Sequence, residues 1–163
     1  MHVRWLQLSA FRNFASLSFE PDPGLNVLIG ANGQGKTSLL EAVHLLLAGR
    51  SFRTARLAEC VAWDAAAAAV AGEVEQGVQR REIRLTLAAR GGVEMAGGPC
   101  PWARVVRFTA ADLGLLNGAP SVRRAYLDGA SAKLAPAHAE ACQRYRLVLH
   151  QRNGLLGRLA GRG

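Results

Sequence analysis

The stretch of sequence that predicts the fold reads Gly30-Ala31-Asn32-Gly33-Gln34-Gly35-Lys36-Thr37-Ser38. Its first eight residues fit the pattern G-x-x-x-x-G-K-[ST] of a phosphate-binding loop. A short, mostly apolar run at residues 25–29 precedes it and predicts a buried strand, and apolar residues at helical spacing follow it over residues 36–48. The order strand, glycine-rich loop and helix lets backbone N–H groups and a helix N-terminus face phosphate oxygens.

The residue types in this loop suit a nucleotide. Glycines at positions 30, 33 and 35 allow a close approach of the backbone that side chains would block. We expect Lys36 to reach the β- and γ-phosphates and the Thr37 hydroxyl to hold Mg²⁺. Lys36 is one of only two lysines in a chain that otherwise uses arginine, which favours a role for a compact ammonium. The alternative is a glycine-rich turn that caps a helix without a ligand.

The rest of the sequence predicts an α/β chain with a β-rich segment after the first helix. Residues 2–8 and 15–19 alternate apolar and polar positions, which predicts two strands joined by Phe11-Arg12-Asn13-Phe14. Further short strands are expected at residues 67–74, 81–87, 93–96 and 105–108. Two helices are expected near the end, one over residues 121–129 and a longer one that begins at Pro136.

The positive charge is concentrated in the second half of the chain. Residues 1–80 hold seven basic and seven acidic side chains, whereas residues 81–163 hold thirteen basic and five acidic ones. No acid follows Glu140, but five arginines do: Arg144, Arg146, Arg152, Arg158 and Arg162. A polyanion or an acidic protein would complement this segment, and a solvated basic helix face is the alternative.

Length and composition exclude several classes of protein. The 163 residues, 50% of them hydrophobic, suffice for an ordinary core without disulfide or metal staples. No apolar run approaches the ~18 residues of a membrane span, and the N-terminus does not resemble a signal peptide, so we expect a soluble cytoplasmic protein. Cys60, Cys100 and Cys142 are far apart and are expected to be free thiols.

Four runs, in their order and spacing, resemble the RecF family of bacterial recombination mediators: FRNF (11–14), GANGQGKTSLLEAVHLL (30–46), GRSFRT (49–54) and FTAADLGLLNGAPSVRRAYLD (108–128). The resemblance covers nearly the whole chain. It implies a P-loop NTPase head of the ABC/SMC type, with residues 1–120 as its N-terminal part and residues 121–163 as the beginning of an inserted helical lid. It also implies an ATP-dependent homodimer that binds single-stranded and gapped duplex DNA, works with RecR and RecO in recombinational repair and replication-fork maintenance, and is linked to SOS induction.

The same resemblance extends the candidate nucleotide site. Arg12 and Asn13 match an Arg-Asn pair that such heads place near the nucleotide phosphates, and a guanidinium beside a triphosphate is a natural charge-assisted pair. Asn32 matches a loop residue that faces the γ-phosphate side of the partner subunit. For Arg12, the alternative is a surface cation on a turn.

Three residues of the last run, Asp112, Arg123 and Arg124, each allow more than one role. Asp112 lies in a segment where such heads carry a linker that senses Mg²⁺ and nucleotide, but Ala110-Ala111 stand where the family more often has Pro and Glu. Arg123 and Arg124 suit either a contact with DNA or an anchor that ties a helix to an acidic neighbour.

Two elements that ABC-type hydrolysis requires are not found in the sequence: a signature loop and an apolar strand that ends in acidic residues. The family places both beyond residue 163. We therefore expect the N-terminal part of a longer protein, which binds ATP weakly and scarcely hydrolyses it alone. Two alternatives stay open: a small, self-sufficient P-loop phosphotransferase, and a fragment without independent activity.

Overall fold

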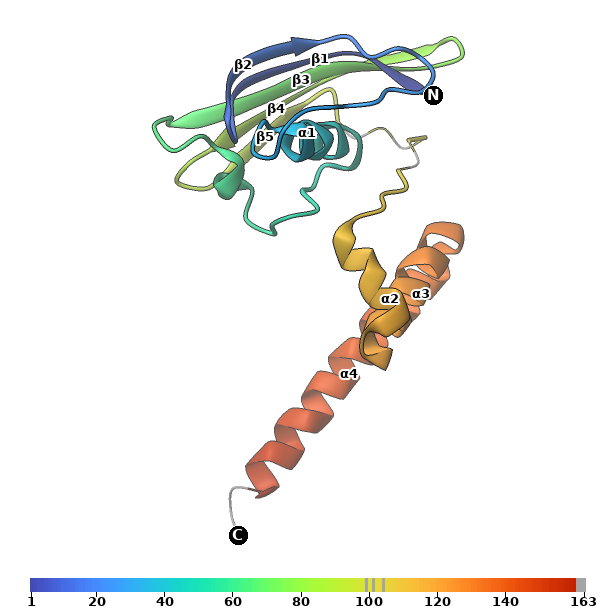
Figure 1. The fold of residues 1–163 in the computed structure, drawn as a ribbon. Coiled ribbons are helices and arrows are strands. Elements are labelled where there is room, and N and C mark those ends of the chain that lie inside the picture. The colour runs from blue at the N-terminus through green and yellow to red at the C-terminus, as the bar shows by residue number, and fades with distance from the viewer. Residues whose placement is uncertain (99, 101, 104, 161–163) are drawn as a thin grey trace. The chain divides into compact units, whose positions relative to one another are not determined.

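The computed structural model describes residues 1–98, 100, 102–103 and 105–160, so the predicted cation Arg162 lies outside the described residues. The chain forms two compact units, Met1–Val106 and a second one that begins at Arg107 (Figure 1). The first unit contains the glycine-rich loop, and the second is helical. The functional division predicted between residues 120 and 121 stays a prediction.

The first unit is built on a five-stranded sheet with the order β2-β1-β3-β4-β5, in which all neighbours are antiparallel. The strands are β1 (His2–Phe11), β2 (Phe14–Phe19), β3 (Ala67–Gln76), β4 (Gln79–Ala88) and β5 (Val93–Ala96). In β4, Ile83, Leu85 and Leu87 are buried and the residues between them are exposed, as the period of a strand requires. The five predicted strands in these regions are confirmed, but β1, β3 and β4 each extend beyond the predicted ends.

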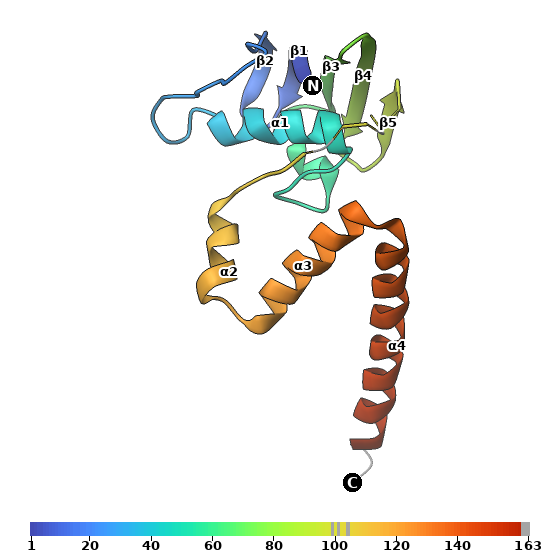
Figure 2. The ribbon, with the colours of Figure 1, turned by 90° about the vertical axis from the view of Figure 1, so that its right-hand side faces the viewer.

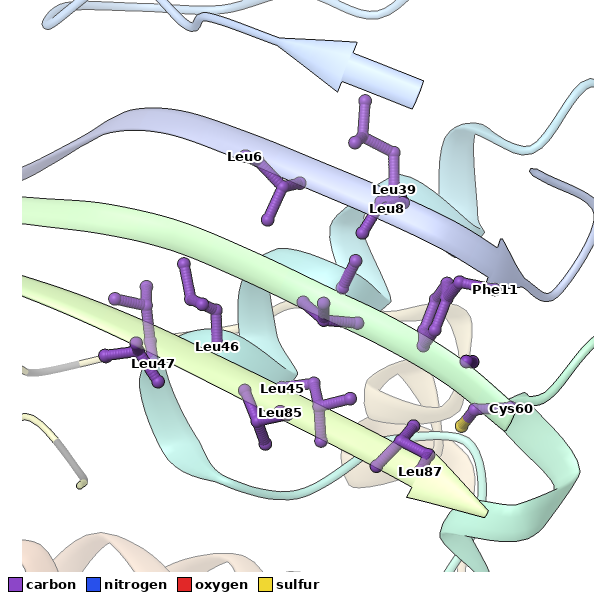
Figure 3. Packing of buried hydrophobic residues seen from close by; sticks show 14 of the residues in the cluster. Leu6, Leu8, Phe11, Leu39, Leu45, Leu46, Leu47, Cys60, Leu85 and Leu87 are labelled. Atoms are coloured by element: carbon purple, nitrogen blue, oxygen red, sulfur yellow. The ribbon is translucent and has the colours of Figure 1, made fainter. Parts of the chain in front are cut away.

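Helix α1 (Lys36–Ala48) lies along one face of this sheet (Figure 2). Leu45 and Leu46 of the helix pack with Leu85 and other apolar side chains of the strands, and together they form the core (Figure 3). The close approach depends on Gly72 of β3, because a Cβ there would lie 2.6 Å from Leu46 Cδ2 and 2.7 Å from the Trp5 carbonyl oxygen. The helix predicted over residues 36–48 is confirmed, and Gly49 ends it in the left-handed conformation.

The strands predicted over residues 25–29 and 105–108 are wrong, because both segments are irregular. Leu25, Val27 and Ile29 are 87%, 69% and 90% exposed, and Phe108 is 79% exposed. An apolar run becomes a strand only where a neighbouring strand takes up its N–H and C=O groups. Among the described residues, the sheet ends at β2 and β5 and pairs with neither segment.

The second unit consists of helices α2 (Gly114–Asn117), α3 (Pro120–Leu134) and α4 (Pro136–Ala160), and a 3₁₀ helix over Ala110–Leu113 precedes them. Both predicted helices are confirmed, but α3 continues past Gly129 for another turn. Prolines begin α3 and α4, where a missing N–H group does no harm. In the part of the chain that the structure describes, no helix has the length and apolar character needed to cross a membrane.

Candidate functional site

The glycine-rich loop has the backbone that a phosphate-binding loop needs. Gly30, Gly33 and Gly35 have φ values of 155°, 85° and 96°, which side chains strongly disfavour. Gly35 is the N-cap of α1, and its carbonyl oxygen accepts the first helical hydrogen bond, from Leu39 N at 2.8 Å. The first turn of α1 carries no acidic residue. The positive end of the helix dipole therefore meets no negative side chain of its own first turn.

Lys36 bends back over the loop. Its Nζ donates hydrogen bonds to the carbonyl oxygens of Gly30, at 2.8 Å, and of Ala31, at 2.7 Å. These two carbonyl oxygens hold the ammonium beside the loop, and phosphate oxygens are stronger acceptors because they carry charge. The lysine can therefore exchange neutral acceptors for anionic ones without leaving the loop.

The other predicted loop residues differ in exposure. Thr37 is exposed at the start of α1, as are Ala31, Asn32 and Gln34 of the loop. Ser38, in contrast, is only 7% exposed and belongs to the buried side of the helix. The structure thus leaves the Thr37 side chain accessible to a ligand and covers Ser38.

The turn between β1 and β2 lies against the loop. A Cβ on Gly35 would stand 2.6 Å from both Asn13 Nδ2 and Phe14 Cζ. Only glycine allows this contact, because its positive φ and the closeness of Asn13 each exclude a side chain. The structure therefore brings the predicted Asn13 to the glycine-rich loop.

Arg12 is held by an ion pair on the inner side of this turn. Its Nε and Nη2 donate to the two carboxylate oxygens of Glu41, at 2.9 and 2.7 Å, and its Nη1 donates to the Glu59 carbonyl oxygen at 2.6 Å. The Arg12 side chain is 18% exposed. Since a guanidinium has five N–H groups, two of them are not used by these bonds. The contact of Arg12 with a phosphate stays a prediction.

Glu41 is the residue that joins the parts of this region. Its side chain is fully buried, and besides Arg12 it accepts hydrogen bonds from Ser51 Oγ at 2.5 Å and from Arg53 Nη1 at 3.2 Å. The Cys60 thiol lies 3.6 Å from the same carboxylate. Glu41 therefore connects helix α1 to the β1–β2 turn, to the loop after the helix and to the 3₁₀ helix Leu57–Cys60.

The buried network fixes the charge of its members. Burial raises the pKa of Glu41, but hydrogen bonds from Arg12 and Ser51 outweigh it, so this pKa lies below its ordinary value. The hydrogen bond to Glu41 raises the pKa of Arg12. Burial and the neighbouring Glu41 charge raise the pKa of the Cys60 thiol to about 11. At neutral pH the carboxylate is therefore charged and the thiol is neutral.

The sequence prediction did not include Glu41, Ser51 or Arg53 in the site. The sequence did contain a signal for Glu41. Residues 38, 41 and 45 share one side of a helix, so Glu41 falls on the side that packs against the sheet. A carboxylate there needs partners. The run GRSFRT supplies two of them, but the sequence alone shows only its resemblance to a family.

Asp112 and Arg123 of the second unit have local partners. Asp112 Oδ2 accepts hydrogen bonds from Thr109 N at 2.6 Å and from Thr109 Oγ1 at 2.7 Å, and these bonds lower the pKa of Asp112. Arg123 Nη1 donates to the Gly118 carbonyl oxygen at 3.0 Å, and Arg124 is exposed. Asp112 and Arg123 thus stabilise turns within this unit.

Comparison with known proteins shows one family match and close sequence relatives along most of the chain. The model of the family described as "AAA domain" matches residues 6–111. The chain is 39% identical to the "DNA replication and repair protein RecF" of Pelotomaculum thermopropionicum and covers 44% of that protein with 96% of its own length. It is 37% identical to the RecF of Heliobacterium modesticaldum, covering 45% of it. The chain spans about 45% of the length of these curated relatives.

Comparison with solved structures also finds RecF proteins. A structure described as "the recombination mediator protein RecF-ATPrS in RecFOR pathway" superposes with a TM-score of 0.79 at 28% identity, over 96% of this chain and 45% of that one. The one described as "RecF-ATP" gives a TM-score of 0.75 over 96% of this chain and 44% of that one. An SMC ATPase structure, at 18% identity and a TM-score of 0.61, covers 78% of this chain and 98% of its own, and shares the fold.

Proposed function

Because the chain belongs to the AAA domain family and is homologous to RecF proteins over nearly its whole length, we propose that it binds ATP through residues 30–38 as part of a RecF-like DNA replication and repair protein. One observation carries this proposal: three positive-φ glycines lead into α1, with the Lys36 ammonium already held over them. The similarity to a structure described as RecF-ATP supports the choice of nucleotide.

In the proposed complex, the triphosphate lies over the loop. Backbone N–H groups from residue 31 to residue 37 and the N-terminus of α1 donate to phosphate oxygens. Lys36 leaves the carbonyl oxygens of Gly30 and Ala31 for the β- and γ-phosphates. Asn32 lies in the exposed part of the loop, where a partner subunit can approach it. Because the Ser38 side chain is buried, Ser38 would contribute its backbone N–H group and not its hydroxyl.

Mg²⁺ would accompany the nucleotide. The Thr37 hydroxyl fits one position of its octahedral shell, because it is exposed at the first turn of α1, and phosphate oxygens and waters would supply the rest. The ion would neutralise charge on the β- and γ-phosphates. Asn13 lies against Gly35 and can donate from its amide to a phosphate, whereas Arg12 has two N–H groups left for one while it stays paired with Glu41.

DNA is the proposed macromolecular ligand, single-stranded or gapped duplex. Arg144, Arg152 and Arg158 are exposed on α4, and a helical repeat of 3.6 residues brings these positions within about 120° of one another. The described residues provide none of the three with an ion pair, while Arg146 on another side of the helix approaches Asp128 at 3.7 Å. Three unpaired guanidinium groups on one side of a helix suit a phosphate backbone.

The wider assembly follows from homology alone. We expect ATP to bring two copies of the complete protein together, as the SMC ATPase structure is described in terms of "ATP-driven dimerization". The description of the RecF structures names a "RecFOR pathway", which supports RecR and RecO as partners. A protein of DNA replication and repair acts on the bacterial chromosome, so the proposal includes a cytoplasmic location and the link to the SOS response.

The proposed nucleotide site is tested by replacing one lysine at a time. Lys36→Ala removes the ammonium from the loop, and Lys133→Ala is the matched control, since these are the only two lysines. A charge-assisted contact of about 1.5–3 kcal/mol predicts that Lys36→Ala weakens Mg-ATP binding about 10- to 100-fold in an equilibrium titration. Equal affinity of both variants would exclude the loop as the ATP site.

The DNA proposal is tested by the dependence of affinity on salt. Each lost phosphate contact should reduce the slope of log affinity against log salt by about 0.7 unit on single strands and 0.9 on duplex. We expect Arg152→Ala with Arg158→Ala to lower the slope by up to twice that amount, and Gln151→Ala, next to Arg152, to leave it unchanged. An unchanged slope in the double variant would remove this side of α4 from the interface.

A further inference from the structure

Three metal-ligating side chains meet where α3 and α4 pack together. Asp128 lies on α3, and His138 and Cys142 lie one turn apart on α4. One donor atom from each of the three residues lies within 4.8 Å of the others. All three side chains are partly exposed, so an ion can enter from solvent and a water molecule can complete its shell.

The distances suit a tetrahedral metal ion. Cys142 Sγ lies 3.3 Å from His138 Nε2, and His138 Nε2 lies 3.7 Å from Asp128 Oδ1. Ligands at zinc bond lengths of about 2.0–2.3 Å stand about 3.3–3.7 Å apart around a tetrahedral ion. The donor atoms of Asp128 and Cys142 lie within 4.8 Å of each other, and rotation of the partly exposed Asp128 carboxylate can adjust this separation. The spacing of four residues also places two ligands on one side of a helix, as in known helical zinc motifs.

The set of donors selects the kind of metal. A thiolate, an imidazole and a carboxylate together match the borderline-soft Zn²⁺ and do not match Mg²⁺ or Ca²⁺, which require oxygen ligands. The thiolate and the carboxylate carry two negative charges, which balance the charge of the ion. Arg146 Nη2, at 3.7 Å from Asp128 Oδ2, is the local competitor, and its exposed side chain can move away.

We propose that Asp128, His138 and Cys142 bind Zn²⁺ and thereby link α3 to α4. This site shares no residue with the proposed nucleotide loop. The outcome of the nucleotide-binding test therefore does not decide the zinc proposal. The ion joins residues on both sides of the short connection between the two helices. It therefore acts as a staple for a pair of helices that otherwise bury little apolar surface.

The experiment uses the full chain with reduced thiols and Co²⁺ as a spectroscopic probe. Binding of one Co²⁺ per chain should give the intense near-ultraviolet absorption of a cobalt–thiolate bond, and Zn²⁺ should displace the cobalt because it binds such sites more tightly. Cys142→Ser should abolish this absorption. Cys100→Ser is the matched control and should retain it.

A second pair of variants separates ligation from folding. His138→Gln should weaken Zn²⁺ binding at least about tenfold, whereas His150→Gln, on the same helix, should leave it unchanged. Far-ultraviolet circular dichroism would show whether each variant keeps its helices. The proposal fails if the chain takes up no Co²⁺, or if Cys142→Ser with intact helices keeps the absorption, because the metal would then lie elsewhere.

Discussion

Seventeen hydrophobic residues are buried between Leu6 and Cys100, whereas none of the described residues from Arg107 onward joins them. The sheet unit assembles its core from strands far apart in sequence and from α1. The helical unit instead leaves large apolar side chains such as Leu134, 88% exposed, and Tyr145, 67% exposed, on its surface. Tertiary packing therefore stabilises the first unit, while local helix formation and the α3–α4 contact stabilise the second.

Within the sheet unit, the residues before and after the glycine-rich loop also differ in burial. The end that enters α1 is fixed by the buried residues Leu39 and Glu41. The other end, residues 25–29, has three apolar side chains in solvent and no strand beside it among the described residues. A helix N-terminus thus holds one side of the candidate phosphate site, whereas on the opposite side Leu28 is the one residue of 25–29 that packs against the core.

The largest expected effect comes from removing the carboxylate at the centre of the sheet unit. Glu41→Ala leaves Arg12 without its buried partner and releases Ser51 and Arg53. Breaking such a pair on one side lowers the free energy of unfolding by about 3 kcal/mol. Denaturant unfolding followed by circular dichroism measures the loss. Glu140→Ala on the exposed face of α4 is the control. A comparable loss of unfolding free energy in this variant would contradict the proposed difference in packing between the units.

The same substitution should have opposite effects in the two units. Gly72→Ala puts a methyl group against Leu46 and the Trp5 carbonyl, and we expect it to destabilise the sheet unit by about 2 kcal/mol. Gly129 lies in α3, where a new Cβ would meet nothing within 4 Å apart from its chain neighbours and the backbone of its own helix, so Gly129→Ala should stabilise the helix by up to about 1 kcal/mol. Thermal melting of both variants measures these changes. A shift of the melting temperature in the same direction for both variants would contradict the proposed difference in packing.

Acid should weaken the sheet unit through Glu41. The pKa of Glu41 is lower in the folded chain than in the unfolded one, so its stabilising contribution is complete above the unfolded value of about 4.3 and is lost as pH falls through the folded value. Glu41→Gln should therefore be less stable than the original chain at neutral pH and should flatten the decline below about pH 4. An unchanged decline would show that other carboxylates cause it.

The smallest effect concerns thiol chemistry. With its pKa raised to about 11 by burial, Cys60 has about 100-fold less thiolate at neutral pH than an ordinary cysteine. In the metal-free chain, Cys142, which is partly exposed on α4, should react with an alkylating reagent long before Cys60 does. Mass spectrometry of partly labelled chains gives the order, and early labelling of Cys60 would mean that the sheet unit opens readily.

The sequence predicted the parts of the molecule in which local pattern and packing agree. Alternation in β3 and β4 and the helical spacing after Lys36 are such cases, as is the glycine-rich loop itself. Residues 25–29 have the apolar character of a strand, but pairing depends on a neighbour that no local pattern reveals. Glu41 was missed for a related reason, because its partners come from segments on both sides of α1 that only the fold brings together.

The most direct test of the nucleotide site follows the backbone amides of the loop by nuclear magnetic resonance while Mg-ATP is added to the full chain. We predict that the amide signals of Gly33 and Gly35 shift in a saturable manner, and that Lys36→Ala greatly reduces the shift at the same ATP concentration. The signals of Gly77 and Gly129, outside the loop, should stay in place. Saturable shifts elsewhere, with those of Gly33 and Gly35 unmoved, would contradict the assignment of ATP to this loop.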